Sequence, residues 1–362
     1  MTDNKANVAL LRDAYHSFND EGVRAFERVL APEVELLERP RDVRHRRRDR
    51  EDTLARLEEL GWQTWRIEPL EFEVFGDRVL VPVAETVPAP DGGAPTERTR
   101  IHYWKLGPEG ASRLEVFRKR AAAVNAAVGY FALLERLHER LRPRTYVEIG
   151  VHMGRSLGRV PPGTVSIGID PEPKVVDTAV EEAARIFKVT SDDFFRDYDL
   201  RSELGGMPVD FAFIDGMHLF EFALRDFMNL ERYCTPQSVV MLHDCYPRER
   251  SHAERDRQTV AWCGDVWKVV PCLREQRPDL NVAAIDIRPE GMGIITSLDP
   301  ESTVLWDSYD EIEARYMALD YDWVEEAQEE RLARLEHDWA QIEALLPPPF
   351  QEAPEPVGEP AA

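Results

Sequence analysis

The sequence predicts two folded domains: an α+β domain in the first third of the chain, then an α/β domain with a mostly parallel, doubly wound sheet. Residues 65–120 contain several strand-like stretches separated by turns rich in glycine and proline. From residue 143 onward, short apolar runs of strand length alternate with helical patterns, an order typical of βαβ units. A length of 362 residues is enough for two separate hydrophobic cores.

The composition excludes some classes of binding partner for the protein. A net charge of −23 argues against binding of duplex nucleic acid, which requires a basic face. No apolar run approaches the roughly 18 residues that a membrane span needs, and no signal peptide is recognisable at the N-terminus. The cysteines show no C-x-x-C pairing, so we expect free thiols in a cytoplasmic protein. They are Cys234, Cys245, Cys263 and Cys272.

Residues 1–120 are expected to form the α+β domain. Asn7–Phe18 places its apolar residues at helical spacing, and a second short helix ends near Pro32. A short strand and the helix 51–60 follow. The remaining predicted strands are 65–75, 78–87, 98–106 and 114–120.

This order of elements, together with the phrases at 14–22 and 30–36, resembles the NTF2-like, SnoaL-like cone. The resemblance implies either a polyketide cyclase or isomerase, or a module that holds a ligand or dimerises. A cyclase would need an acid–base pair. The candidates His16, His45 and His102 have no partner that spacing identifies, so we expect an accessory domain.

After a linker and leading helices at 121–142, the predicted α/β domain spans 143–300. Its first strand, 146–149, meets a turn bracketed by Gly150 and Gly154, and a second strand, 164–169, ends in Asp170. Glycines let the backbone approach a ligand, and an acid at the second strand end accepts hydrogen bonds from ribose hydroxyls.

The turn also carries an acid, Glu148, which would repel a phosphate and suits a cationic or neutral ligand such as S-adenosylmethionine. The run Val147–Gly154 resembles the first motif of class I methyltransferases, (V/L)-E-(I/V)-G-x-x-x-G. The resemblance implies S-adenosylmethionine as cofactor. The alternative is a Rossmann-like βαβ unit that binds another ligand. The implied cofactor contacts are Glu148, Gly150, Gly154 and Asp170.

Two acids follow the predicted third strand, 187–190. In class I methyltransferases the loop after this strand usually touches the adenine, so the resemblance implies that Asp192 or Asp193 lies near its exocyclic amine. Because residue 194 onward can be helical, either acid could instead be a helix N-cap.

The most informative stretch runs from residue 209 to residue 244. One apolar strand ends in Asp215, and the next buried strand, 238–242, is followed by His243 and Asp244. Adjacent parallel strands bring these side chains to one edge of the sheet, where open α/β sheets bind ligands. Two carboxylates and an imidazole suit a divalent cation. His218 is within reach as a general base.

The pattern I-D-G-x-H-x-(F/Y)-E followed by H-D-x-x-P resembles metal-assisted O-methyltransferases that act on sugars and other natural-product hydroxyls. The resemblance implies Asp215 and Asp244 as metal ligands, with His218 as the base. His243 stands where that type usually has an acid, so the ion could be Mg²⁺, Mn²⁺ or a softer ion, or absent. Asp215 could instead contact the methionine end of the cofactor or cap the following helix. His218 could instead form a hydrogen bond with Glu221, its neighbour three residues along a helix.

Beyond the motifs, residues 248–257 are charged and are expected to form a mobile lid or a loop over the site. Trp262 and Trp267 either line a substrate pocket or pack in the core. Strands are predicted at 280–287 and 291–296. The C-terminal region 301–346 is expected to be helical, including 323–345, and the proline-rich 347–362 to be disordered.

We therefore expect a methyltransferase that uses S-adenosylmethionine to methylate a hydroxyl of a small molecule, a natural product or its sugar, and that acts as a homodimer or higher oligomer. N-methylation is the alternative within the enzyme class. A second alternative is an NTF2-like ligand-binding or scaffold protein with a non-catalytic methyltransferase domain. A cyclase fused to an auxiliary domain is a third.

Overall fold

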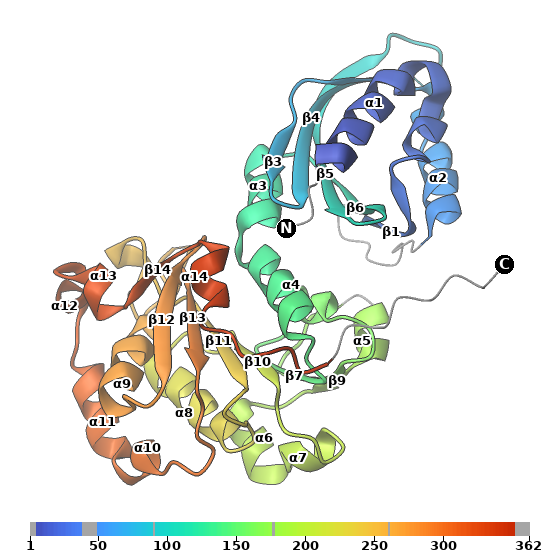
Figure 1. Cartoon of the computed structure of the whole chain (residues 1–362). Coiled ribbons are helices and arrows are strands. Elements are labelled where there is room, and N and C mark those ends of the chain that lie inside the picture. The colour runs from blue at the N-terminus through green and yellow to red at the C-terminus, as the bar shows by residue number, and fades with distance from the viewer. Residues whose placement is uncertain (1–4, 38–48, 90, 176–177, 260, 352–362) are drawn as a thin grey trace. The chain divides into compact units, whose positions relative to one another are not determined.

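Two separate sheets organise the chain (Figure 1). The computed structural model describes residues 5–37, 49–89, 91–175, 178–259 and 261–351. The chain divides into two units, Met1–Ala132 and Leu133–Ala362, and each is described here by itself.

The first unit is built on a six-stranded sheet with the order β1-β6-β5-β4-β2, in which β3 also pairs with β4. β1 and β6 are parallel and the other pairs are antiparallel. The predicted strand 65–75 is in fact two strands, β2 and β3, because Leu70–Phe72 leaves the ladder. The strands are β1 (Leu30–Leu37), β2 (Arg66–Pro69), β3 (Glu73–Phe75), β4 (Arg78–Val87), β5 (Thr96–Gly107) and β6 (Gly110–Phe117).

The helices of this unit are α1 (Lys5–Glu21), α2 (Arg50–Glu59) and α3 (Arg120–Val128). α1 buries Leu11, Ala14, Tyr15 and Phe18, which lie three or four residues apart on one face. α2 begins at Asp49, whose side chain accepts a hydrogen bond from the Asp52 N–H. The α+β class expected for this part of the chain is confirmed.

The second unit contains an eight-stranded sheet with the order β14-β12-β13-β11-β10-β7-β8-β9. β9, β8, β7, β10 and β11 run parallel, and β13 is antiparallel to both of its neighbours. The predicted doubly wound, mostly parallel sheet is confirmed. Its strands are β7 (Thr145–Ile149), β8 (Val165–Ile169), β9 (Ala184–Phe187), β10 (Phe211–Ile214), β11 (Val239–His243), β12 (Asn281–Asp286), β13 (Met292–Thr296) and β14 (Arg334–Glu336).

Helices cover both faces of this sheet. On one face, His138 of α4 (Tyr130–Leu141) packs against the rings of Tyr146 and Phe211. On the other face, alternate strand residues such as Val147 and Ala212 join a core with α8 (Phe220–Glu231). The remaining helices are α5 (Thr178–Ala183), α6 (Ser191–Asp197), α7 (Leu200–Glu203), α9 (Val269–Gln276), α10 (Val304–Asp307), α11 (Tyr309–Met317), α12 (Tyr321–Glu325), α13 (Gln328–Arg331) and α14 (Trp339–Glu343).

Two further element predictions are wrong. The third parallel strand is Ala184–Phe187 rather than 187–190, so the preceding helix stops at Ala183. The expected helix 323–345 is interrupted by β14, which pairs with β12 and extends the sheet. Tertiary pairing with an open sheet edge outweighs the helical spacing of this charged segment.

The tail prediction is partly outside the described residues, which end at 351. Within them, the Phe350 N–H donates to the Leu141 carbonyl, so the start of the proline-rich segment lies against the end of α4. All four cysteines are free, as predicted, and all four are buried. Among the described helices, none has the length and apolar character needed to traverse a bilayer.

Candidate active site

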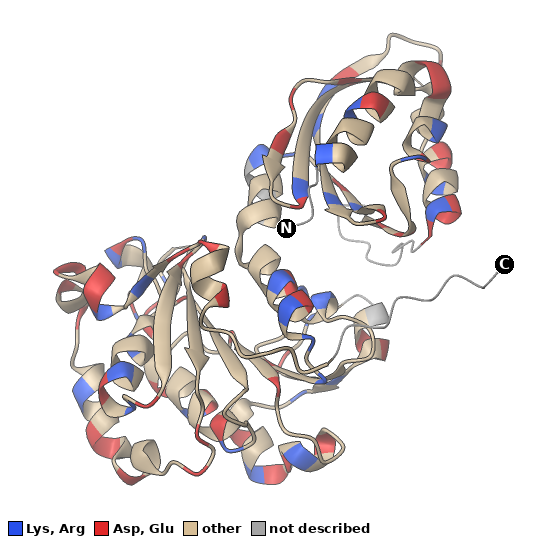
Figure 2. Cartoon of the chain, viewed as in Figure 1, with Lys and Arg blue, Asp and Glu red and all other residues tan. Residues whose placement is uncertain are grey.

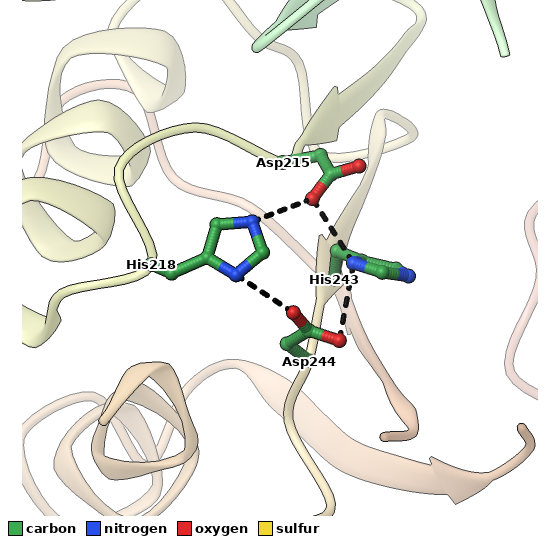
Figure 3. Close-up of side chains that lie close together, drawn as sticks. All are labelled: Asp215, His218, His243 and Asp244. Carbon is green, nitrogen blue, oxygen red and sulfur yellow. Dashed lines mark ion pairs between the residues drawn. The ribbon is translucent and has the colours of Figure 1, made fainter. Parts of the chain in front are cut away.

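Four side chains meet beyond the carboxyl ends of β10 and β11 (Figure 3). His218 lies between two carboxylates: its Nε2 is 3.2 Å from Asp215 Oδ1, and its Nδ1 is 2.8 Å from Asp244 Oδ2. His243 Nδ1 lies 3.0 Å from Asp215 Oδ1 and 3.2 Å from Asp244 Oδ1. One ligand atom from each of the four residues lies within 4.8 Å of the others.

The local backbone aims these side chains at one another. Asp215 directly follows β10, and His243 is the last residue of β11. His218 and Asp244 have φ angles of +57° and +63°, the left-handed region that costs a non-glycine residue free energy. Such strain persists where surrounding structure imposes it, and two of the six described non-glycine residues with positive φ belong to the cluster.

The cluster is electrostatically coupled. Burial opposes the charge of His218, but hydrogen bonds to Asp215 and Asp244 raise its pKa to about 9. Burial likewise opposes the charge of His243, yet both carboxylates hold its pKa well above the ordinary value. Conversely, although burial favours the neutral acids, the two histidines lower the pKa values of Asp215 and Asp244. Without a cation, the charges of the two histidines balance those of the two acids.

The glycine turn after β7 lies directly against this cluster. Gly150 has a φ of +89°, and a Cβ placed on it would be 2.0 Å from the Asp215 carbonyl oxygen. The Asp215 N–H donates to the Ile149 carbonyl at 2.7 Å. Gly154 also has a positive φ, +70°. The predicted cofactor turn and the predicted metal site are therefore contiguous.

Asp170 is oriented by the backbone at the end of β8. Its Oδ2 accepts from the His152 N–H and its Oδ1 from the Glu172 N–H, both at 2.7 Å. Each carboxylate oxygen keeps a lone pair for a ribose hydroxyl. The residues present thus fit the nucleoside half of S-adenosylmethionine.

Glu148 has a different environment from the one expected. It is fully buried, and its two oxygens accept hydrogen bonds from Tyr146 Oη at 2.8 Å and Ser156 Oγ at 2.7 Å. Burial raises its pKa to about 8. These contacts tie β7 to the glycine turn, and direct contact of Glu148 with the cofactor stays a prediction.

The adenine-side acids both have protein partners. Asp192 accepts from the Arg225 guanidinium at 2.9 and 3.1 Å. Asp193 accepts from Thr190 Oγ1 at 2.7 Å, and Thr190 in turn caps the start of α6. Thr190, not either acid, is therefore the N-cap. An adenine contact for Asp192 or Asp193 stays a prediction.

The histidine candidates of the first unit have different environments. His16 is exposed, and His45 lies outside the described residues. His102 is buried, 2.7 Å from Tyr15 Oη and 3.3 Å from Glu85 Oε1. Spacing could not identify these partners because they lie on different elements, 87 and 17 residues away in the sequence.

The two tryptophans are also distinct. Trp267 is buried in the core, stacked on Trp323. Trp262 instead stacks on His218, with ring centroids 5.3 Å apart and planes 7° from parallel. Glu221, the alternative partner considered for His218, is paired with Arg255 at 2.7 Å.

Residues 147–245 match the family model of a methyltransferase domain. No curated protein matches the sequence. Among solved structures, the O-methyltransferase TomG from Streptomyces achromogenes, in complex with SAM, is 16% identical, covers 47% of this chain and 80% of its own, and has a TM-score of 0.37. Cofactor-bound Rv0187 from MTB is 15% identical, covers 49% of this chain and 86% of its own, and has a TM-score of 0.37.

For the first unit, an NTF2-like protein of unknown function from Burkholderia pseudomallei is 20% identical, covers 33% of this chain and 96% of its own, and has a TM-score of 0.28. The family match covers both motifs, from β7 to the end of β11. The chain therefore carries a methyltransferase domain, and that domain is of the S-adenosylmethionine-dependent class.

Proposed function

We propose that the chain transfers a methyl group from S-adenosylmethionine to a hydroxyl oxygen of a small molecule, a natural product or its sugar, and that it works as a homodimer or higher oligomer. The observation that carries this proposal is the group Asp215, His218, His243 and Asp244, which lies beside the Gly150 turn. Methyl acceptor and cofactor would meet there.

His218 is the proton acceptor in this proposal. His218 has a pKa of about 9 in the cation-free cluster, and this pKa would fall if a cation neutralised the two carboxylates. Asp244 Oδ2, 2.8 Å from Nδ1, would then hold the remaining proton on that nitrogen and leave the lone pair on Nε2. The acceptor hydroxyl gives its proton to Nε2 as its oxygen attacks the methyl carbon. The carbon–sulfur bond breaks in the same step, and its electron pair stays on sulfur, giving S-adenosylhomocysteine.

The donor set fits a divalent cation. Asp215, Asp244 and His243 would hold it, since their ligand atoms already face one another. When bound, such an ion lowers the pKa of a coordinated hydroxyl. An imidazole donor favours Mn²⁺ or a later transition metal over Mg²⁺, which prefers oxygen ligands.

The test is calorimetric titration of S-adenosylhomocysteine into EDTA-treated full-length protein, repeated with Mg²⁺ and with Mn²⁺. We expect binding in the low-micromolar range or tighter, and a separate metal-binding heat that is lost in D215N and D244N. The exposed variant D307N serves as control, since Asp307 lies away from the cluster on α10. Absence of S-adenosylhomocysteine binding under every condition would favour the scaffold alternative.

The acceptor atom needs a second test. Radiolabelled S-adenosylmethionine is incubated with catechols, glycosylated phenols and matched primary amines. Label on the hydroxyl compounds alone supports O-methylation, whereas label on the amines alone supports the N-methyltransferase alternative.

A further inference from the structure

Among the described residues, Trp262 has the aromatic ring that lies nearest to the His218 ring. The two rings are almost parallel, 7° apart, with centroids 5.3 Å from each other. The indole N–H donates to the Glu254 carbonyl at 2.6 Å, which fixes the plane of the tryptophan. The guanidinium of Arg257 also lies over the indole, 5.8 Å from its centroid.

The backbone beyond Trp262 is pressed against the loop that carries His218. Gly264 has a φ of +58°, and a Cβ on it would lie 1.8 Å from the His218 carbonyl oxygen. The N–H groups of Cys263 and Gly264 both donate to the His252 carbonyl, at 2.9 and 3.1 Å. The contact between the two loops is therefore set by main chain as well as by side chains.

Asp265, the residue after Gly264, attaches the same segment to the start of α8. Its Oδ1 accepts from the Phe220 N–H at 2.8 Å, and its Oδ2 lies 2.6 Å from Arg255 and 3.0 Å from Lys268. Asp265 is almost completely buried. The three residues that follow Trp262 are thus each held by main-chain or side-chain contacts.

We propose that Trp262 is a positioning residue for His218. Rotation about the bond between Cβ and an imidazole ring has a broad energy profile, and the left-handed backbone at His218 adds strain. Stacking on Trp262 holds the ring in the plane where Nδ1 meets Asp244, which leaves Nε2 for the acceptor proton. This assignment rests on the proposed function of His218 as base, and the stacking itself can be tested without any acceptor.

The experiment compares the full-length wild type with W262F, which keeps a stacking ring, and W262L, which does not. W306L is the matched control, because Trp306 is a partly exposed tryptophan of the same unit on α10. Histidine-selective ¹⁵N labelling reports the tautomer and ring motion of His218, with its signal assigned from H218Q. Titration of S-adenosylhomocysteine checks that each variant is folded.

In the wild type, W262F and W306L we expect one sharp His218 ring signal, because the ring is held in one orientation. In W262L we expect that signal to broaden or average, while the affinity for S-adenosylhomocysteine stays within about threefold of wild type. An unchanged His218 signal in W262L would overturn the proposal. So would the lack of nuclear Overhauser contacts between the Trp262 and His218 rings in the wild type, a measurement that needs no variant.

The two hypotheses fail in different ways. A wild type that does not bind S-adenosylhomocysteine contradicts the methyltransferase function but leaves the His218 signals readable. Normal S-adenosylhomocysteine binding with a His218 ring that is insensitive to Trp262 contradicts only the positioning role.

Discussion

His218 is held between two carboxylates, and the two contacts give its ring nitrogens different roles. The shorter contact, 2.8 Å from Nδ1 to Asp244, orients the ring, and the longer one, 3.2 Å from Nε2 to Asp215, is the one an acceptor hydroxyl would replace. Asp215 can release this contact at little cost, since it also faces His243.

We expect H218A to lower the rate of methyl transfer by about 10²- to 10⁴-fold, the usual contribution of a general base. Its affinity for S-adenosylhomocysteine should stay close to that of the wild type, because Gly150 and Asp170 are untouched. The rate is measured with radiolabelled cofactor, and H16A, an exposed histidine of the other unit, is the control. Wild-type turnover in H218A would remove this residue from the mechanism.

His243 decides the kind of ion in the proposed metal site. In the wild type we expect Mn²⁺ to bind at least about tenfold more tightly than Mg²⁺, since an imidazole replaces an oxygen ligand. The variant H243E supplies a carboxylate in place of the imidazole, and we expect it to reduce the ratio of Mn²⁺ affinity to Mg²⁺ affinity. Competition measured by the electron paramagnetic resonance of free Mn²⁺ reports both affinities, and equal preferences in the two proteins would contradict a ligand role for His243.

At the scale of elements, the site exists because β7, β10 and β11 are adjacent and parallel. Their carboxyl ends place the Gly150 turn, Asp215 and His243 at one edge of the sheet. β7 and β10 are also the two strands between which the chain order reverses, the point where open α/β sheets bind ligands.

G150A should disrupt this junction. Its Cβ would lie 2.0 Å from the Asp215 carbonyl oxygen, so β10 or the turn must move, and we expect weaker S-adenosylhomocysteine binding and a lower thermal midpoint. G163A is the matched control: Gly163 has nearly the same φ, +88°, but open space around its Cβ. That control should lose only about 1–2 kcal/mol of stability. Equal losses in both variants, by calorimetry, would show that backbone strain alone is responsible.

At the scale of the whole molecule, buried acids link stability to pH. Burial raises the pKa of Glu148 to about 8 and that of Asp226 to about 7, above their ordinary values of 4.5 and 3.8. At pH values between the ordinary and the raised pKa of each acid, the folded state holds a proton that the unfolded state has lost. The contribution of these two acids to the free energy of unfolding therefore falls as the pH rises from about 4 to about 8.

Replacing Glu148 with Gln removes one of these titrations. We expect E148Q to flatten the stability profile between pH 5 and 8, by at most about 1.4 kcal/mol per pH unit. Urea unfolding at several pH values measures the slope. E301Q, at an exposed position, should keep the wild-type profile, and a wild-type slope in E148Q would mean that other groups cause it.

The net charge and both fold classes could be predicted from the sequence without the tertiary structure. The −23 charge, the alternation of apolar runs with helical patterns and the motifs at 147–154 and 214–221 are properties of the sequence alone. They were enough to predict both fold classes and to indicate which residues end the central strands. The order of strands in a parallel sheet then made Asp215, His218, His243 and Asp244 neighbours, since consecutive strand ends share one edge.

Only the tertiary structure decided contacts between residues distant in sequence. It buried Glu148 under Tyr146 and Ser156, paired Asp192 with Arg225, and placed β14 rather than a helix at the sheet edge. It also stacked Trp262 on His218, 44 positions earlier, across two loops that no periodic pattern connects. Contacts between loops depend on which surfaces the completed sheet brings together. The spacing of residues in the sequence therefore does not predict these contacts.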